Sequence, residues 1–282
     1  MKKISWLIAG FLVLILILFI MISSVYGMEV VSQPEHDALI KKIEAIGYTE
    51  AEIFGDERVI LLATTPGAKE GIGYFSPESK LFQPDSIRRG QEILREKMEV
   101  LQEAEKTFGV KKEILLAVFR LETNFGRFIG KNLVFNSLYR IFVFKERKWG
   151  EGELLNYLKL CRVNGYDPLN VVGSDMGAFG MYQFLPSSFI NFAKDWDGDG
   201  KIDLFSFKDA LFSAANYLRF YGCNKKTPVK IRGALFIYNH QSNYVKAILA
   251  YAETLDPNFN DNLLKDLKKL KRFVEYKYGY KK

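Results

Sequence analysis

Hydrophobic residues recur every three to four positions through most of the chain, which is the spacing of one face of an α-helix. No segment alternates between apolar and polar residues for long, as a half-buried β-strand would. Residues 48–84 carry turn signals and predict loops, with a short extended piece near "RVILLA". We therefore predict a mostly α fold. The predicted helices cover about 34–47, 85–108, 111–126, 152–164, 186–194, 207–221, 229–238 and 241–254.

The N-terminus has the pattern of a membrane-targeting segment. Lys2 and Lys3 precede residues 4–27, which carry no charge. A membrane span needs about 20 apolar residues, whereas the apolar part of a cleavable signal peptide has about 7–15. We favour an uncleaved N-terminal anchor with its basic end inside, and the small-residue ending "SSVYG" leaves cleavage open. Either outcome predicts a periplasmic or otherwise extracytoplasmic protein, anchored to the inner membrane by residues 4–26 if uncleaved.

The remaining chain is predicted to form one folded unit, because nothing in its composition suggests disorder or repeats. We assign residues 1–27 to the anchor or signal peptide, 28–33 to a tether, 34–256 to the folded domain and 257–282 to a basic C-terminal helix or tail. In that tail, leucines at helical spacing alternate with lysines. This pattern fits a terminal helix packed by its leucines, or a helix lying on a membrane surface.

The net charge of +7 suits an anionic partner. Nucleic acid is a poor candidate for an exported chain, whereas lipid head groups and an acidic cell-wall polymer are within reach. The two cysteines, Cys161 and Cys223, fit either a disulfide or two buried free thiols.

A carboxylate lies on the apolar side of the predicted helix 111–126. At 100° per residue, Glu122 falls beside Leu115 at the edge of the apolar stripe. A buried Glu is commonly a structural residue paired with Arg or Lys, but this helix ends at once in "TNFG", which opens a loop beside the carboxylate. Desolvation by neighbours such as Leu115, Val118 and Phe125 should raise the pKa of Glu122. A carboxylic acid that stays protonated near neutrality is what protonation of a glycosidic oxygen requires.

Two further segments have compositions typical of binding sites, although each alone is weak evidence. Residues 173–189 combine closely spaced glycines with Gln183, whose amide can donate and accept hydrogen bonds. They lack the lysine of a phosphate loop, which disfavours nucleotide binding. In "IYNHQSNY", Tyr238, Asn239 and Tyr244 bring aromatic faces and an amide together, which suits sugar rings. The chain has only two histidines, which disfavours a Ser-His-Asp triad or a histidine-bound catalytic metal.

The segment "DWDGDGKID" has the spacing of an EF-hand calcium loop. Loop positions 1, 3, 5, 6 and 7 are taken by Asp195, Asp197, Asp199, Gly200 and Lys201, the last through its carbonyl. Position 12 is Ser206 rather than Glu, so Asp209 is the candidate for the closing carboxylate. Carboxylates this close repel one another without an ion, which favours bound Ca²⁺ over a metal-free turn. A single loop inside a helical domain favours a structural ion over a sensor.

These motifs in this order resemble the membrane-bound lytic murein transglycosylase B family of peptidoglycan-cleaving enzymes. The resemblance covers most of residues 35–252 and is carried by "LETNFGRFIG", "DPLNVVGSDMGAFGMYQFLPSSF", "DWDGDGKIDLFSFKDALFSAANYL" and "IYNHQSNY". It implies a lysozyme-like α domain over 34–256 with Glu122 as the catalytic residue. The substrate-binding residues implied by position are Ser174, Gln183, Tyr217, Tyr238, Asn239 and Tyr244. The calcium ligands implied are Asp195, Asp197, Asp199, the Lys201 carbonyl and Asp209.

The activity that the resemblance implies is a lyase-type cleavage of the β-1,4 bond between N-acetylmuramic acid and N-acetylglucosamine. Glu122 would act first as the acid and then as the base, and the sugar's own 6-hydroxyl would close a 1,6-anhydro ring. No organic cofactor is implied, and peptidoglycan glycan strands are the expected partner of a monomeric protein.

Two departures from the family pattern concern the cleft. Family members usually carry a long, partly β insertion between the helix that holds Tyr217 and the Y-N motif, but here only 20 residues lie between Tyr217 and Tyr238. The cleft is therefore expected to be shorter or more open on that side. An arginine pair that family members use for substrate contacts matches only loosely with Arg147 and Lys148.

Two other functions stay open at this point. A hydrolytic muramidase would need a second carboxylate, since ordinary glycosidases use a pair, and Asp175 is the candidate. A non-catalytic, calcium-stabilised module that binds the cell wall would need neither carboxylate for chemistry.

Overall fold

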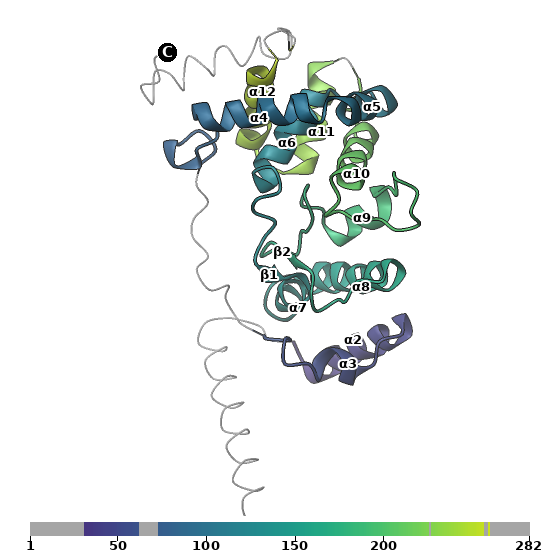
Figure 1. The fold of residues 1–282 in the computed structure, drawn as a ribbon. Helices are drawn as coiled ribbons and strands as arrows, with labels where there is room; N and C mark the ends of the chain where they lie inside the picture. Colours follow the sequence, from purple (N-terminus) through teal and green to yellow (C-terminus); the bar gives the residue numbers. More distant parts are fainter. Residues whose placement is uncertain (1–30, 62–72, 226, 257–258, 260–282) are drawn as a thin grey trace, which may run out of the picture.

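The structure is a computed structural model that describes residues 31–61, 73–225, 227–256 and 259. Its described part is built from helices arranged in two groups, one above the other in Figure 1. The upper group comprises α4 (Pro84–Glu96), α5 (Met98–Phe108), α6 (Lys112–Thr123), α10 (Phe207–Phe220), α11 (Pro228–Tyr238) and α12 (Ser242–Leu255). The lower group comprises α2 (Gln33–Ile46), α3 (Glu50–Phe54), α7 (Val134–Phe144) and α8 (Arg147–Asn164). The mostly α fold predicted from the sequence is confirmed.

Short elements connect the two groups. β1 (Asn132–Leu133) and β2 (Val172–Gly173) form an antiparallel pair in which Asn132 lies opposite Gly173. The short helix α9 (Pro186–Phe192) packs against both α8 and α10. A single 3₁₀ turn, η1 (Pro77–Ser79), precedes α4. The chain therefore passes from the upper group to the lower one after α6 and returns through β2 and α9.

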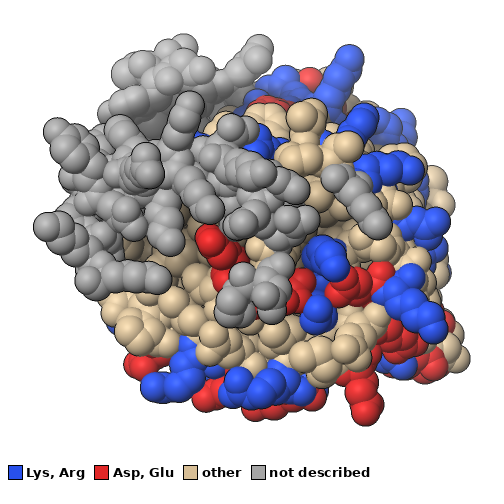
Figure 2. Space-filling view, turned by 90° about the horizontal axis from the view of Figure 1, so that it is seen from above, with Lys and Arg blue, Asp and Glu red and all other residues tan. Residues whose placement is uncertain are grey.

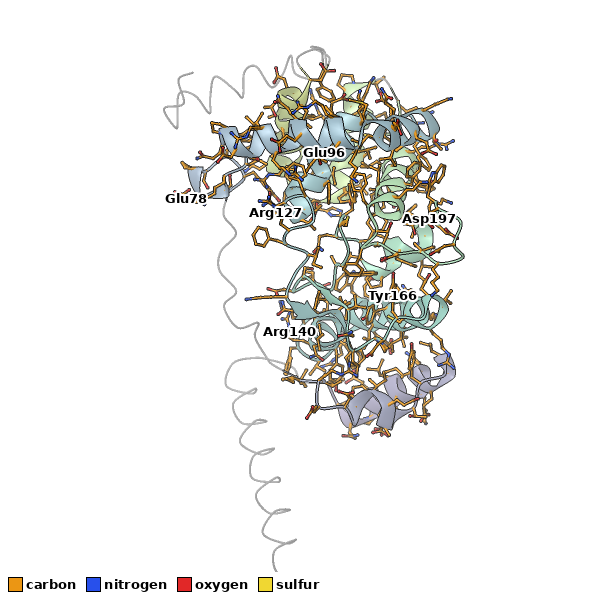
Figure 3. All side chains as sticks on the ribbon, in the orientation of Figure 1. Glu78, Glu96, Arg127, Arg140, Tyr166 and Asp197 are labelled. Atoms are coloured by element: carbon orange, nitrogen blue, oxygen red, sulfur yellow. The ribbon has the colours of Figure 1, made fainter. Side chains whose placement is uncertain are left out.

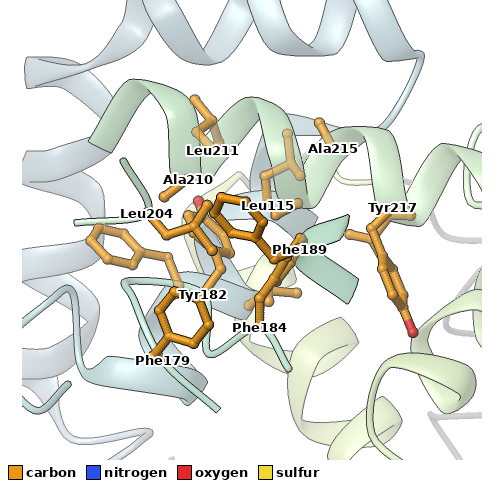
Figure 4. Close-up of a cluster of buried hydrophobic side chains, with 14 of the residues drawn as sticks. Leu115, Phe179, Tyr182, Phe184, Phe189, Leu204, Ala210, Leu211, Ala215 and Tyr217 are labelled. Carbon is orange, nitrogen blue, oxygen red and sulfur yellow. The ribbon is translucent and has the colours of Figure 1, made fainter. Parts of the chain in front are cut away.

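The central helix is α6, which contacts α4, α5, α10 and α12. All residues from Glu113 to Arg120 are buried, which explains why its sequence is apolar almost all round. The core continues from there into the region between α6 and α10, where Leu115, Tyr182 and Phe189 pack together below α10 (Figure 4). This arrangement holds the end of α6 in place while leaving its last turn at the border between the two groups.

Three helix predictions are corrected by the structure. The segment 85–108 is not one helix but two, α4 and α5, which meet at Lys97. Pro84, with its preset φ, starts α4 one residue ahead of the predicted start at 85, and Gln83 is the N-cap. Lys97 has φ −112° and ψ 19°, and the break lets α4 pack on α12 while α5 packs on α10. α8 begins at Arg147, ahead of the predicted start at 152.

Two helices were not predicted at all. α7 is buried along nearly its whole length, polar Ser137 and Arg140 included. Its polar residues Asn136, Ser137 and Arg140 fall on one helical face, so the sequence did carry a periodic signal for it, which the sequence prediction missed. α3 lies in a segment predicted to be loop, and it starts with a capping box between Thr49 and Glu52. An extended piece was predicted near 58–63, of which the structure describes residues 58–61. Arg58 lies in a turn, and residues 59–61 have no regular secondary structure.

The predicted anchor at 1–27 and nearly all of the predicted tail at 257–282 lie outside the described residues. Within the described part of the chain, none of the helices combines the length and the apolar character that a membrane crossing requires. Seen from above, Lys and Arg side chains lie mainly along the right and lower edges of the molecule, where Asp and Glu side chains are interspersed with them (Figure 2).

Candidate active site

The helix that carries Glu122, α6, ends at Thr123, three residues before the predicted end at 126, and the loop expected at "TNFG" opens there. Asn124 caps α6 in the left-handed region with φ 50°, and Phe125 and Gly126 follow with φ 62° and 80°. Three successive residues with positive φ turn the chain sharply away from the helix axis. Glycine adopts positive φ freely, whereas most other residues adopt it at an energetic cost. The Thr123 hydroxyl accepts the Gly126 N–H and donates to the Met181 carbonyl, which ties this turn to the glycine-rich segment. The loop that results carries Arg127 below α6 (Figure 3).

The Glu122 carboxyl has a hydroxyl partner instead of a cation. The Tyr244 hydroxyl donates to Oε1 at 2.6 Å. Burial raises the pKa of Glu122 to about 7, and the hydrogen bond from Tyr244 limits the rise. In the described ranges, no Lys or Arg forms an ion pair with Glu122, so the common structural role of a buried Glu does not apply. The predicted direction of the pKa shift is confirmed, and this acid holds a proton up to about neutrality.

Three tyrosines that the sequence singled out stand together beside this carboxyl. Tyr238, the last residue of α11, lies parallel to Tyr244 of α12 with ring centroids 6.4 Å apart. Tyr217 of α10 meets Tyr238 edge to face at 5.0 Å. Figure 4 shows Tyr217 pointing from α10 toward the yellow-green C-terminal helices. We call Tyr217, Tyr238 and Tyr244 the tyrosine wall. These rings, which arrive from three helices, add to the apolar surroundings expected from α6 itself.

The sequence missed one aromatic residue of this site, Tyr74. Its ring packs edge to face on Tyr244 at 5.9 Å. Burial and the nearby Glu122 raise the pKa of Tyr74 to about 12, while a hydrogen bond with the Asn239 side chain opposes the rise. Asn239 thus joins the site through Tyr74. No local pattern marks Tyr74, because its segment reads as a loop and the contact is made with residues far along the chain.

Arg120 holds the turn that presents Tyr74. It lies two residues before Glu122 on α6 and is buried. Its Nη2 donates to the Lys80 carbonyl at 3.3 Å and its Nε donates to the Ser86 hydroxyl at 2.8 Å. The Ser79 hydroxyl closes the same turn by donating to the Tyr74 carbonyl at 2.9 Å. One helix therefore positions both the acid and the loop that covers it.

Two predicted substrate-binding residues use their polar groups within the glycine-rich segment. The Ser174 hydroxyl accepts the backbone N–H groups of Met176 and Ala178. Gln183, at φ 50°, donates from Nε2 to the carbonyls of Ile129 and Gly180. In the structure these contacts shape the 173–183 turn and join it to the loop after α6.

Asp175, the candidate second carboxylate, is engaged in the same turn. Its Oδ1 accepts from the Asn132 side chain, and its backbone carbonyl accepts from Arg140 at 2.8 Å. Arg140 belongs to α7 and lies in the lower group (Figure 3). The contacts of Asp175 are thus with β1 and with α7 of the lower group, whereas the hydrogen bond of Glu122 is with α12 of the upper one.

The predicted calcium loop brings three carboxylates together. One oxygen from each of Asp195, Asp197 and Asp209 lies within 4.8 Å of the others. The loop reaches the edge of the molecule beside α9 and α10, where Figure 3 labels Asp197. Asp199 is outside this group, and its carboxylate accepts the Lys201 N–H at 2.8 Å. Across the described residues, no Lys or Arg ion pair involves these aspartates.

The donor set fits a hard cation. Asp209 is buried on the first turn of α10, where its two oxygens accept the N–H groups of Trp196 and Asp203. Asp195 accepts the N–H groups of Gly198 and Gly200 in the same way. Backbone donors hold the oxygens in place, and carboxylate oxygens are the ligands that calcium prefers.

Cys161 and Cys223 are free thiols in the structure, and both are buried. Burial raises the pKa of each to about 12, so neither is a nucleophile near neutral pH.

The architecture is that of solved lytic transglycosylases. A lytic transglycosylase of Escherichia coli, SLT35 in complex with calcium, superposes with a TM-score of 0.60 at 24% identity, covering 66% of this chain and 78% of that one. SltB3 from Pseudomonas aeruginosa, in complex with NAG-anhNAM-pentapeptide, superposes with a TM-score of 0.69 at 21% identity over 79% of both chains. At these identities the likeness establishes the fold.

Sequence comparison establishes the family. Residues 51–234 match the model of the transglycosylase SLT domain, which is more than half of the chain. The membrane-bound lytic murein transglycosylase B of Escherichia coli (strain K12) is 35% identical over 154 residues. That alignment covers 54% of this chain and 43% of the relative, so the match spans less than half of the relative's length. This chain belongs to the transglycosylase SLT domain family.

Proposed function

We propose that this protein is a peptidoglycan lytic transglycosylase. It cleaves the β-1,4 bond between N-acetylmuramic acid and N-acetylglucosamine without water and leaves a 1,6-anhydro end. The observation that carries the proposal is the Glu122 carboxyl, whose pKa burial raises to about 7 and whose partner is a tyrosine hydroxyl. The family, the name of the Escherichia coli relative and the NAG-anhNAM ligand named for SltB3 support the substrate class.

The chemistry needs one group that gives a proton and then takes one. Protonated Glu122 donates to the glycosidic oxygen, and the bond from that oxygen to the anomeric carbon breaks. The substrate's own N-acetyl oxygen stabilises the anomeric carbon. The Glu122 carboxylate then accepts the proton of the 6-hydroxyl, whose oxygen bonds to the anomeric carbon. Protons and bonds balance without water, and Tyr244 stabilises the carboxylate between the two steps.

The remaining residues of the site bind the sugar. Tyr238, Asn239 and Tyr74 are partly exposed next to the acid and offer ring faces and polar groups, whereas Tyr217 and Tyr244 are buried and pack against Tyr238. Ser174 and Gln183 act by holding the glycine-rich turn, which lets backbone approach the substrate. The calcium ligands Asp195, Asp197 and Asp209, with Asp199 and the Lys201 carbonyl completing the loop, stabilise the start of α10. Residues 4–26 anchor the protein to the membrane that faces its substrate.

A hydrolytic muramidase is the second candidate. It would use Asp175 to activate water. However, the Asp175 carboxylate already accepts a hydrogen bond from the Asn132 side chain of β1, and its backbone carbonyl accepts one from Arg140 of α7. Its products would carry a reducing end. A non-catalytic wall-binding module would release no product at all.

The test is a digestion of purified peptidoglycan by the full-length chain in detergent, followed by mass spectrometry. Glu122→Gln is the matched variant, because it keeps the size and hydrogen-bonding capacity of the side chain without a transferable proton. We expect 1,6-anhydro products from the natural protein and none from the variant. Reducing-end products would replace the proposal with a muramidase, and an absence of products from both proteins would favour the binding module.

A further inference from the structure

We propose that Phe220, supported by Phe192 and Tyr221, forms an additional glycan-binding subsite at the end of α10. We call these three rings the aromatic shelf. The inference rests on the proposed function, and it adds a contact for sugar units that lie away from the cleaved bond. The ligand class is an N-acetylated saccharide chain.

Phe220 is unusually exposed for its type. It is the last residue of α10, and 69% of its surface is accessible to solvent. Its ring is nevertheless held firmly, because Phe192 lies 5.1 Å away on one side and Tyr221 meets it edge to face at 5.1 Å. An exposed aromatic ring with fixed neighbours is a preorganised binding surface, because little side-chain freedom is lost when a ligand lies on it.

Continuous ring contacts connect this shelf to the candidate acid. Tyr221 lies 4.9 Å from Tyr217, which is part of the tyrosine wall. From Tyr217 the contacts continue through Tyr238 to Tyr244, and Tyr244 donates to Glu122. Phe192 also touches Tyr217, edge to face at 4.9 Å. Tyr217 and Tyr244 are themselves buried, so these contacts fix the exposed Phe220 ring relative to the candidate active site through the core.

The two helices under the shelf are fixed to each other. Asn216 of α10 donates from its side chain to the Phe192 carbonyl at 2.9 Å, at the end of α9. The Tyr217 hydroxyl donates to the Ile237 carbonyl of α11 at 3.3 Å. These contacts keep the spacing between shelf and tyrosine wall constant, which a polymer that binds both at once requires.

Sugar rings suit this surface. A pyranose presents C–H groups on its faces and hydroxyls at its edges, so it packs on an aromatic face while the edges stay in water. A glycan strand cut at an internal bond must extend beyond the tyrosine wall in at least one direction. The shelf offers an apolar surface of that kind, in ring contact with the wall.

The experiment measures binding of N-acetylglucosamine oligomers to the full-length chain in detergent, in the Glu122→Gln background so that nothing is cleaved. A disaccharide and a hexasaccharide are titrated by calorimetry. Phe220→Ala should weaken hexasaccharide binding roughly 3- to 10-fold, the effect of one lost aromatic contact, and leave disaccharide binding unchanged. Phe220→Trp should restore the affinity for the hexasaccharide. Val163→Ala, at a position 84% exposed on α8, is the control and should change neither.

Several results would overturn the proposal. An unchanged hexasaccharide affinity in Phe220→Ala would remove the shelf as a subsite. An equal loss for both oligomers would locate the effect in the tyrosine wall instead. Failure of the hexasaccharide to bind the Glu122→Gln protein would also remove the shelf. In a parallel assay with anionic lipid vesicles, a loss of vesicle binding in Phe220→Ala with unchanged hexasaccharide affinity would assign Phe220 to a membrane contact.

The cleavage assay on the natural protein is run in parallel and separates the two proposals. If it yields no products while Phe220→Ala still shows the length-dependent loss, the proposed activity is wrong and the shelf stands as a glycan site. If products appear and the length dependence is absent, only the shelf is wrong.

Discussion

Two regions of this protein place carboxyl groups in opposite environments. Around Glu122, aromatic rings and one hydroxyl surround a single carboxyl, and its pKa rises to about 7. In the loop at 195–209, backbone N–H groups hold three carboxylates within 4.8 Å of one another. The first environment disfavours the charged form, and the second gathers negative charge around a place for a cation.

The difference shows that a carboxyl group takes its role from its surroundings. An apolar pocket with one weak donor holds a proton that can be given to a substrate. A ring of backbone donors holds oxygens that can bind a metal but have no proton to give. Changes in the first region should therefore act on chemistry, and changes in the second on stability.

The largest expected effect is on the cleavage rate, measured in the same assay for one variant of each region. Glu122→Gln should lower the rate at least about 10²- to 10⁴-fold, the usual contribution of a general acid or base. Asp197→Asn, measured with saturating calcium, should leave the rate within a fewfold of the natural protein. A strong loss of rate in the Asp197 variant under these conditions would contradict the division of roles.

Removal of calcium should lower stability. An ion that binds only the folded state adds about 2.7 kcal/mol at a concentration 100 times its Kd, which corresponds to a shift in Tm of about 5–10 °C. We expect chelator to lower the Tm by this amount and calcium to restore it, measured by calorimetry.

Asp197→Asn provides the matched control for that measurement. The Asp197 carboxylate is exposed and has one long backbone contact, to the Asp199 N–H at 3.4 Å. The variant should resemble the natural protein in chelator and respond less to calcium. Identical melting curves with and without calcium in the natural protein would show that the loop is a metal-free turn.

The stability of the natural protein relative to Glu122→Gln should depend on pH. The folded-state pKa of Glu122, about 7, lies above its ordinary value of 4.5. Between these values the folded protein keeps a proton that the unfolded chain has lost, so the contribution of Glu122 is full below pH 4.5 and is lost as the pH rises through about 7. Denaturant midpoints of the two proteins from pH 4 to 8 test this. A constant difference across that range would show that the surrounding groups do not desolvate the Glu122 carboxyl.

The smallest expected effect is a shift of the pH profile in Tyr244→Phe. In the natural protein, kcat/KM should fall above about pH 7 as the acid loses its proton. Because the Tyr244 hydroxyl stabilises the charged carboxylate, its removal should move this fall to higher pH by about 0.7 unit, the equivalent of a hydrogen bond of about 1 kcal/mol. A move to lower pH would mean that water enters the site. Tyr157→Phe, which alters a hydroxyl bonded to the Pro168 carbonyl in the lower group, is the control and should not shift the profile.

Much of this protein could be predicted from short stretches of sequence. Helices with one apolar face, such as α2 and α5, showed their period, and Gly47 and Gly109 marked helix ends by chemistry that acts within a few residues. The spacing of Asp195 and Asp197 indicated the acidic loop, and the position of Glu122 at a helix end indicated an accessible acid. Each of these signals depends on residues only a few positions apart, so it can be recognised in the sequence alone.

Other features were decided only by the tertiary structure. The burial of both sides of α7, polar Ser137 and Arg140 included, follows from its packing against α8 and its other neighbours, and the break at Lys97 follows from what α4 and α5 pack against. The hydrogen-bond partner of Glu122 is Tyr244, which lies 122 residues further along the chain. Tyr74 reaches the site from a loop that no sequence motif marks. Short sequence motifs contain the residue types needed for the chemistry. The pKa of Glu122, however, depends on burial among groups from separate helices, and only folding brings those groups together.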